Sequence, residues 1–330
     1  MNPSRFLVTG GSGFIGAALV KRLVGHGHIV RVLDNGFRSS NQALSEVIDD
    51  IEIVHGDIRN REIVIAALKN IDTVIHLAAV NGTENFYTQP TLVLDVGVRG
   101  MLNVLEGCLE HDVPDIILAS SSEVYQTPSK IPTDENEPLV IPDIMNPRYS
   151  YGGSKIISEL LVVNCARSNF QRAVIFRPHN VYGPAMGWEH VLPQFIVRTM
   201  EGMEKHPHGK IPFLMQGNGQ QTRSFIHIDD MIDGIMLLIG KGKHLNIYHI
   251  GNPEEITIAD FAKRVASYFS RELEIQPDTL TQGSTERRCP NINKMRNLGF
   301  NPGVSLEIGL PPTIEWYASR INQRTLMEKT

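Results

Sequence analysis

One stretch near the N-terminus decides the fold of this chain, and it reads Arg5-Phe6-Leu7-Val8-Thr9-Gly10-Gly11-Ser12-Gly13-Phe14-Ile15-Gly16. The apolar residues 6–8 predict a short buried strand. Glycines follow at once, and a helical pattern of apolar residues begins at Ala17. Glycine permits a sharp turn and close approach of a pyrophosphate, and the helix directs unpaired N–H groups at that anion. Strand, glycine turn and helix therefore predict a dinucleotide site, with a glycine-rich turn that binds no ligand as the alternative.

The next predicted strand, residues 29–33, ends in Asp34. This position is close to the offset of ~20 residues at which a carboxylate binds the adenosine ribose of a dinucleotide. Such a carboxylate would repel a 2′-phosphate, so NAD is favoured over NADP. Arg38 follows nearby and keeps NADP open.

The composition describes an ordinary globular protein of 330 residues, with 42% hydrophobic and 20% charged residues. The net charge of −5 argues against a nucleic-acid groove. The chain has no apolar run long enough to span a membrane and no signal-peptide pattern at its N-terminus, so we expect a cytoplasmic location. Cys108, Cys165 and Cys289 are scattered without metal-ligand spacing, so we predict no metal site.

Strand and helix patterns alternate along the first half of the chain. Further strands are predicted at residues 51–54, 73–79, 116–119 and 173–176, and helices at residues 61–68, 92–111 and 151–167. Polar loops are predicted at residues 35–42, 81–90 and 127–148. This alternation predicts an α/β fold of the Rossmann type, a doubly wound parallel sheet with helices on both faces. Ligands of such sheets bind at the carboxyl ends of the strands.

Several candidate residues lie at predicted strand ends. Asp57 could contact the adenine ring or cap the helix of residues 61–68, and the local pattern leaves both open. The small residues Ala78 and Ala79 would leave room for a cofactor. His76 alone is more typical of a packed histidine than of a catalytic one. Ser120, Ser121, Ser122 and Glu123 follow the strand of residues 116–119.

Beyond Arg177, prolines and glycines become frequent and the predicted elements become shorter. We therefore assign residues 1–176 to the cofactor-binding domain and residues 177–330 mainly to a smaller C-terminal substrate-binding lobe. Segments of about residues 225–250 are expected to return to the large sheet.

Tyr151 and Lys155 form the second anchor of the analysis. Their four-residue spacing places both on one face of a helix. An ammonium group beside a phenol stabilises the phenolate, which can then take a proton from a sugar or alcohol hydroxyl. A serine of the cluster at residues 120–122 could hold the reacting oxygen.

Together these motifs resemble the extended short-chain dehydrogenase/reductase family, in its nucleotide-sugar epimerase, dehydratase and decarboxylase branch. The resemblance covers nearly the whole chain. The matching stretches are the glycine turn, His76-Leu77-Ala78-Ala79, Ser120-Ser121-Ser122-Glu123-Val124-Tyr125, Tyr151 to Lys155, Arg177-Pro178-His179-Asn180-Val181-Tyr182-Gly183-Pro184, Gln221-Thr222-Arg223-Ser224-Phe225 and Arg287-Arg288-Cys289-Pro290.

The resemblance implies transient oxidation of a nucleotide-diphosphate sugar at C4, with NAD retained as the hydride store, and a homodimer formed by the helices of residues 92–111 and 151–167. Ser121 matches the catalytic Ser/Thr, Tyr151 the base and Lys155 the partner that also holds the nicotinamide ribose. The predicted cofactor site comprises Gly10, Gly13, Phe14, Ile15, Gly16, Asp34, Asn35, Asp57, Ile58, Leu77, Ala78, Ala79, Tyr151 and Lys155. The predicted substrate site comprises Glu84, Asn180, Leu192, Arg223 and Arg288.

The product is expected to depend on Ser122 and Glu123. The 4,6-dehydratases of the family carry Asp-Glu here, so Ser122 removes their acid. Ser-Ser-Glu resembles decarboxylases acting on nucleotide-linked glucuronic acid, and Arg148 is similar to that branch. Plain 4-epimerases would not need Glu123.

Base rates in the family place epimerisation slightly first, decarboxylation second and dehydration third. A non-catalytic NAD(H)-binding regulator is the alternative of another class, and it predicts a broken Ser/Tyr/Lys set, whereas all three residues are present. Trp188 could stack on substrate or pin a loop.

Overall fold

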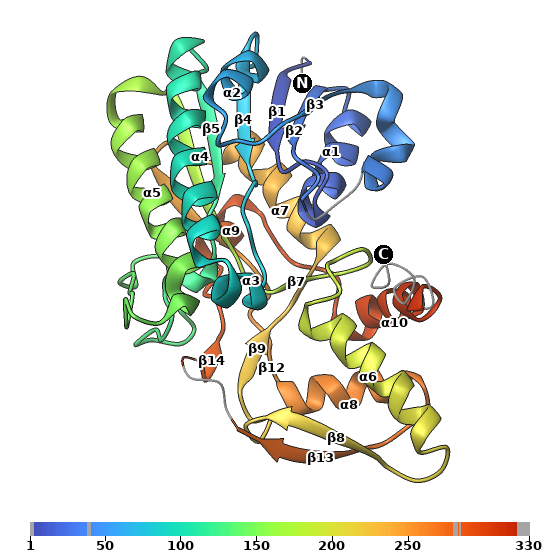
Figure 1. The fold of residues 1–330 in the computed structure, drawn as a ribbon. Helices are drawn as coiled ribbons and strands as arrows, with labels where there is room; N and C mark the ends of the chain where they lie inside the picture. The colour runs from blue at the N-terminus through green and yellow to red at the C-terminus, as the bar shows by residue number, and fades with distance from the viewer. Residues whose placement is uncertain (1–2, 38–40, 280–282, 284, 322–330) are drawn as a thin grey trace.

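The computed structural model describes residues 3–37, 41–279, 283 and 285–321. Within these residues the centre of the molecule is a seven-stranded sheet in the order β11-β6-β5-β4-β1-β2-β3, in which every neighbouring pair is parallel (Figure 1). This confirms the predicted Rossmann-type doubly wound sheet. Its strands are β1 (Arg5–Thr9), β2 (Ile29–Asp34), β3 (Ile51–His55), β4 (Thr73–His76), β5 (Asp115–Ala119), β6 (Arg172–Pro178) and β11 (Asn246–Ile250).

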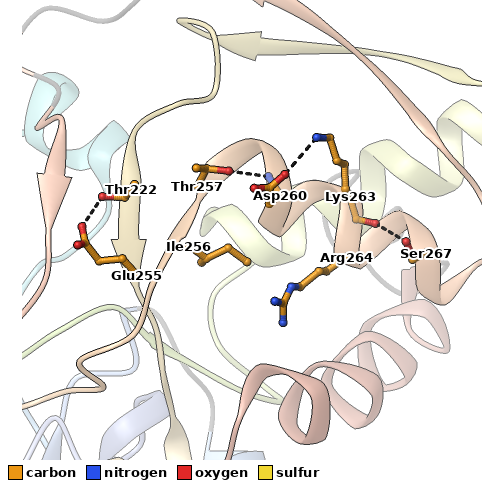
Figure 2. A pocket seen from close by; sticks show the side chains of 8 residues that line it. All are labelled: Thr222, Glu255, Ile256, Thr257, Asp260, Lys263, Arg264 and Ser267. Atoms are coloured by element: carbon orange, nitrogen blue, oxygen red, sulfur yellow. Dashed lines mark hydrogen bonds and ion pairs between the residues drawn. The ribbon is translucent and has the colours of Figure 1, made fainter.

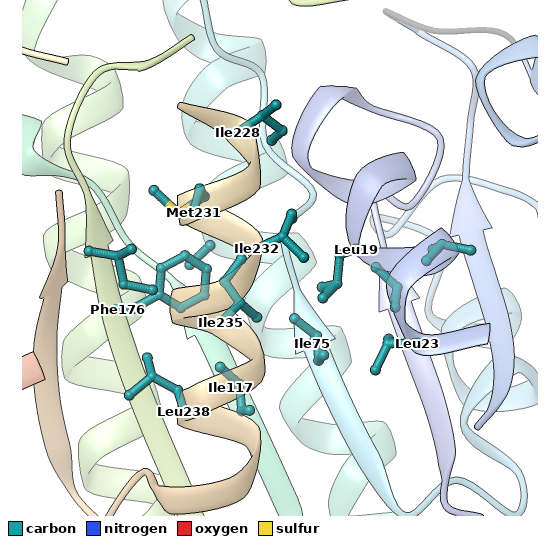
Figure 3. Close-up of a cluster of buried hydrophobic side chains, with 14 of the residues drawn as sticks. Leu19, Leu23, Ile75, Ile117, Phe176, Ile228, Met231, Ile232, Ile235 and Leu238 are labelled. Atoms are coloured by element: carbon teal, nitrogen blue, oxygen red, sulfur yellow. The ribbon is translucent and has the colours of Figure 1, made fainter. Parts of the chain in front are cut away.

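Helices cover both faces of the sheet because successive strand residues point to opposite sides. Ile75 of β4 faces the core shared with α1 (Phe14–Gly25) and α7 (Ile228–Lys241), which Figure 3 shows at close range. Val74, its neighbour, faces the core on the other side. There the sheet is covered by α2 (Arg61–Leu68), α4 (Pro90–Glu110) and α5 (Ser150–Asn169). The 3-10 helix η1 (Asn41–Asp50) lies against α1.

Late segments of the chain add to the sheet. Strand β11 pairs in parallel with β6, so that Asn246 lies opposite Val174 and Ile250 opposite Pro178. Helix α9 (Asn293–Leu298) packs against β11 and α7. The end of β6 therefore lies between elements that are far apart in sequence.

A smaller lobe lies below the sheet in the view of Figure 1. It has its own apolar core, which includes Phe195, Phe213, Phe225 and Phe261. Its helices are α6 (Val191–Lys205), α8 (Ile258–Tyr268) and α10 (Leu306–Ala318), and its strand pairings join β8 (Ile211–Gln216) to β13 (Leu273–Asp278) and β9 (Thr222–Ser224) to both β12 (Glu255–Thr257) and β14 (Arg287–Arg288). The short strands β7 (Val181–Tyr182) and β10 (Ile226–His227) pair in parallel between the two parts.

Some predicted boundaries were wrong. Residues 81–90, predicted as a loop, contain the helix α3 (Thr83–Thr88). Strand β4 ends at His76, three residues earlier than predicted, and η1 begins inside the predicted loop of residues 35–42. Residues 127–148 are irregular as predicted, except where η3 (Pro147–Tyr149) begins. In the part of the chain that the structure describes, no helix is long and apolar enough to cross a membrane.

Candidate functional site

The glycine turn is so tight that side chains are excluded from it. Gly10 has a φ of +70°, and a Cβ there would lie 2.9 Å from the backbone of Ala78. A Cβ at Gly16 would lie 2.2 Å from the carbonyl oxygen of Gly10. Gly13 is the N-cap of α1 and offers no side chain to the first N–H groups of the helix. Those N–H groups remain suited to an anion, so the turn fits the diphosphate of a dinucleotide.

Asp34 lies beside this turn, at the end of β2. Its two carboxylate oxygens accept hydrogen bonds from the backbone N–H groups of Ser12 (3.0 Å) and Gly36 (2.8 Å). Each oxygen keeps a further lone pair, which a ribose hydroxyl could use. Arg38, which kept NADP open, lies outside the described residues. Phe14 and Ile15 are half-buried against the main core.

Asp57 is held by a charged neighbour rather than by a helix. Arg59 donates to both of its oxygens, at 3.0 and 2.7 Å, and Asn35 donates to one of them at 3.1 Å. The hydrogen bond from Arg59 is the main cause that lowers the pKa of Asp57 to about 2. The cap of α2 is Asn60, whose side chain accepts from two helix N–H groups, so the capping hypothesis for Asp57 was wrong. Contact of Asp57 with adenine stays a prediction.

The end of β4 forms the floor next to the glycine turn. Thr9 Oγ1 lies 2.8 Å from His76 Nδ1 and accepts from the N–H of Ala78 at 3.3 Å. His76 is buried, and burial together with the charge of Lys155 lowers its pKa to about 3, so the imidazole is neutral and packed. Leu77, Ala78 and Ala79 are half-buried beyond the strand. The side chain of Ile58 is buried against Gly100 of α4.

Helix α5 brings Tyr151 and Lys155 to the end of β5. The Nζ of Lys155 lies 5.8 Å from the centre of the Tyr151 ring and donates to the carbonyl oxygen of Ala119 at 2.8 Å. Burial lowers the pKa of Lys155 to about 8, against the opposing effect of Glu159. The Tyr151 ring stacks on Phe86 with ring centres 5.0 Å apart. Phe86 belongs to α3, so the helix that sequence reasoning missed supplies the ring partner of the predicted base.

The segment with Ser121 and Glu123 lies against the start of α5. Ser121 is the N-cap of the 3-10 helix η2 (Ser122–Val124), and its Oγ accepts from the N–H of Glu123 at 3.1 Å. A Cβ at Gly152 would lie 2.9 Å from the carbonyl oxygen of Glu123. The glycine that follows Tyr151 thus allows the segment to approach the helix closely.

Glu123 forms an ion pair with Arg288 that the sequence did not predict. The two side chains are 2.6 Å apart, and Arg288 also donates to Thr285 Oγ1 at 3.0 Å. Burial opposes ionisation of Glu123, but the charges of Arg288, Arg148 and Arg223 outweigh it and hold its pKa below the ordinary value. Glu123 is therefore a carboxylate at neutral pH.

Three arginines surround this one carboxylate, so the cluster carries a net positive charge. Arg223 donates to the carbonyl oxygen of Thr222 at 2.7 Å, and burial, with the charges of Arg288 and Arg148, lowers its pKa to about 10. The Nε of Arg148 is buried and has no hydrogen-bond partner among the described residues. An anionic ligand would relieve this excess of positive charge.

The remaining predicted substrate residues are spread over three elements. Asn180, with a φ of +37°, donates from its side chain to the carbonyl oxygen of Ser224 at 2.8 Å. Leu192 is buried in the core of the smaller lobe, and Glu84 is exposed on α3. Trp188 contacts Tyr317 of α10 edge-on, with ring centres 4.8 Å apart, a contact that pins its loop.

Comparison with known proteins identifies the family. The model of the NAD dependent epimerase/dehydratase family matches residues 6–251. The chain belongs to this family. It is 30% identical over 322 residues to UDP-glucuronic acid decarboxylase 1 of Arabidopsis thaliana, covering 96% of this chain and 70% of that protein.

Solved structures of family members extend the comparison. The dTDP-glucose 4,6-dehydratase DesIV of Streptomyces venezuelae, solved with NAD bound, matches with a TM-score of 0.86 at 27% identity, covering 97% of this chain and 98% of that one. The UDP-glucose 4-epimerase of Thermotoga maritima, solved with UDP-glucose, matches with a TM-score of 0.85 at 25% identity, covering 96% and 99%. The cofactor of this family member is NAD, as predicted.

A separate cavity of about 520 Å³ lies in the smaller lobe between β12 and α8 (Figure 2). Its charged residues are engaged with protein groups: Lys263 with Asp260 at 3.1 Å, and Glu255 with Arg287 at 2.6 Å. Among the described residues, no group of three or more His, Cys, Asp or Glu side chains is placed to hold a metal ion.

Proposed function

We propose that this family member decarboxylates a nucleotide-linked uronic acid through transient oxidation at C4. The observation that carries the proposal is the Glu123 carboxylate, held ionised by Arg288 beside Ser121 and surrounded by an excess of positive charge. A substrate with a diphosphate and a sugar carboxylate brings the negative charge that this cluster lacks. The similarity to UDP-glucuronic acid decarboxylases supports the same substrate class.

The proposed reaction begins at the sugar 4-hydroxyl. Tyr151 takes its proton, Lys155 stabilises the phenolate and Ser121 holds the oxygen. Bound NAD supplies the acceptor for the C4 hydride and later returns it. Once C4 is a ketone, the C5–C6 bond can break with its electron pair moving toward the C4 oxygen, and carbon dioxide leaves. C5 then takes a proton from solvent water.

The charge state of the cluster distinguishes the three family reactions. Dehydration needs an acid for the leaving hydroxyl, and the low pKa of Glu123 makes it a poor proton donor. Epimerisation at C4 needs no group at C5, so it gives the ion pair of Glu123 no task. Decarboxylation needs no acid for its leaving group, and it profits from cations such as Arg148 that bind the carboxylate. For these reasons we place decarboxylation ahead of epimerisation, which the sequence analysis ranked first.

The second candidate is 4-epimerisation of a nucleotide-linked sugar. It is favoured by the structural match to the UDP-glucose 4-epimerase of Thermotoga maritima over nearly the whole length of both chains. The same Ser121, Tyr151 and Lys155 would perform it, with the 4-ketone turned before the hydride returns. Glu123 would then be dispensable.

Incubation with UDP-, dTDP-, GDP- and CDP-linked glucuronic acid and glucose, followed by mass spectrometry, tests the proposal. We expect loss of carbon dioxide from a uronic acid. Glu123→Gln should slow this loss by ~100-fold or more. The matched control Glu255→Gln removes the carboxylate that pairs with the neighbouring Arg287 and should leave turnover unchanged. Turnover with unchanged mass and inverted C4 in both variants would contradict decarboxylation and support the epimerase.

We also propose a homodimer in which α4 and α5 face their copies. The outer faces of these helices expose Leu94, Leu102, Leu109 and Leu160, the last with 58% of its surface accessible. Apolar residues gathered on one face mark interaction surfaces. Leu160→Glu should shift the protein toward monomer in sedimentation velocity, and a wild-type monomer would contradict the proposal.

A further inference from the structure

A buried ion pair lies behind the candidate site. Glu159 of α5 and Arg177 of β6 are bonded twice, Nη2 to Oε2 at 2.6 Å and Nε to Oε1 at 2.8 Å. Their side chains are 5% and 2% exposed. Burying two charges costs much of what their attraction contributes, so a buried pair is weak evidence of a role in stability. Its further contacts indicate another role.

The pair fixes both ends of the segment that carries Ser121 and Glu123. Ser120 Oγ donates a hydrogen bond to Glu159. Arg177 donates to the hydroxyl oxygen of Tyr125, and the guanidinium carbon lies 4.9 Å from the centre of that ring.

The residue before the segment, Ala119, accepts a hydrogen bond from Lys155. Residues 121–123 are thus suspended between anchors that share one ion pair and one helix.

Glu159 also acts on Lys155. It lies one helical turn beyond Lys155 on α5, as Lys155 lies one turn beyond Tyr151. Burial disfavours the ammonium form of Lys155, and Glu159 is the group that opposes this effect. The ion pair therefore bears on both halves of the site, the serine segment and the Tyr151/Lys155 pair.

We propose that Glu159 and Arg177 are positioning residues for the reaction, which hold Ser121 and Glu123 in place against Tyr151 and keep Lys155 charged. This inference rests on the roles given to Ser121, Tyr151 and Lys155 in the proposed function. Neither positioning residue needs to touch substrate, because each acts through a residue that does.

The first test is Glu159→Gln, which keeps the shape of the side chain and removes its charge. We expect kcat to fall by ~10- to 100-fold with little change in KM, and the alkaline limb of kcat to move to lower pH. The matched control is Asp115→Asn, which breaks the Arg172–Asp115 pair at the other end of the same two strands, where Nε and Oδ1 are 3.0 Å apart. This control should change neither quantity.

A second variant guards against loss of folding. Glu159→Gln leaves Arg177 buried without its counter-charge, whereas Glu159→Gln combined with Arg177→Met leaves no buried charge unpaired. The double variant should melt cooperatively and still show the low kcat, because Ser120 and Tyr125 have lost their anchors. A folded double variant with wild-type kcat and pH profile would overturn the inference.

A measurement that needs no substrate separates this inference from the proposed function. Selective ¹³Cε labelling of lysine, with the Lys155 signal assigned through Lys155→Met, follows the titration of Lys155 by NMR. In both Glu159 variants its pKa should lie below the wild-type value of about 8. An unchanged titration overturns the electrostatic part of the inference. A wild-type protein that turns over no uronic acid but shows the titration shift refutes only the proposed function.

Discussion

Replacement of Arg288 by methionine tests the electrostatics of the candidate site most directly. Methionine keeps much of the side-chain volume and removes the guanidinium, so Glu123 loses the partner that lies 2.6 Å away. The side chains of Arg288 and Glu123 are only 8% and 22% exposed, so water replaces the lost charge poorly. We expect the folded state to become less stable at neutral pH.

The magnitude follows from the geometry. Two unit charges whose centres are about 4 Å apart attract by ~4 kcal/mol at an effective dielectric constant of ~20. Arg148 and Arg223 still attract Glu123 in the variant. The net loss in the free energy of unfolding should therefore be about 2–3 kcal/mol, somewhat below the cost of breaking a fully buried pair.

The sign of the pH dependence follows from the lowered pKa of Glu123. A carboxylate with a lowered pKa stabilises the folded state above its unfolded value of 4.5, and this contribution is lost as the pH falls through the folded pKa. The difference between wild type and Arg288→Met should therefore be largest near neutrality. It should shrink toward zero as Glu123 takes up its proton in acid.

Urea unfolding at neutral pH and at about pH 4 measures the difference. The matched control is Arg287→Met, which breaks the exposed pair of Arg287 with Glu255, also 2.6 Å long, on the opposite face of β14. This control should cost less than about 0.5 kcal/mol at either pH. An Arg288→Met destabilisation that is equal at both pH values, or no larger than that of the control, would refute the reasoning.

Three further predictions concern the cofactor turn and the base. Tyr151→Phe should retain NAD, measured by release and chromatography, yet lose ~100-fold or more of turnover; full activity would remove Tyr151 as the base. Gly16→Ala should abolish NAD retention because its Cβ would meet the Gly10 carbonyl oxygen at 2.2 Å, whereas Gly25→Ala, with open space around it, should retain NAD. In kcat/KM, activity should fall as pH rises above about 8, where Lys155 loses its proton, and a flat alkaline profile would contradict this.

The sheet and the cofactor turn could be predicted because their signals are local. A short apolar run and a glycine turn each specify a structure within a few residues, and the carboxyl ends of parallel strands must share one edge. The predicted range of α2, residues 61–68, is confirmed for the same reason. Its cap was assigned wrongly because Asn60 and Asp57 are both suitable N-cap residues, and only the backbone shows which one precedes the first turn.

The centre of the candidate site depends on contacts that no local pattern records. Glu123 and Arg288 are 165 residues apart, and either of the adjacent Arg287 and Arg288 could have faced the cluster. The strand β14 decides between them, because neighbouring residues of a strand point to opposite faces. Phe86 was missed because α3 has only six residues, too few to show an apolar period.

Helix α5 carries Tyr151, Lys155 and Glu159 at intervals of four residues. Inserting one residue after Tyr151 would rotate the other two away from it together by ~100°. These groups therefore form a single inherited unit that evolution can keep or lose but cannot adjust piece by piece. Residues 121–123 lie on a separate short turn, where one substitution changes one group. New products on this scaffold are expected to arise by changes in that turn, while the helix is passed on intact.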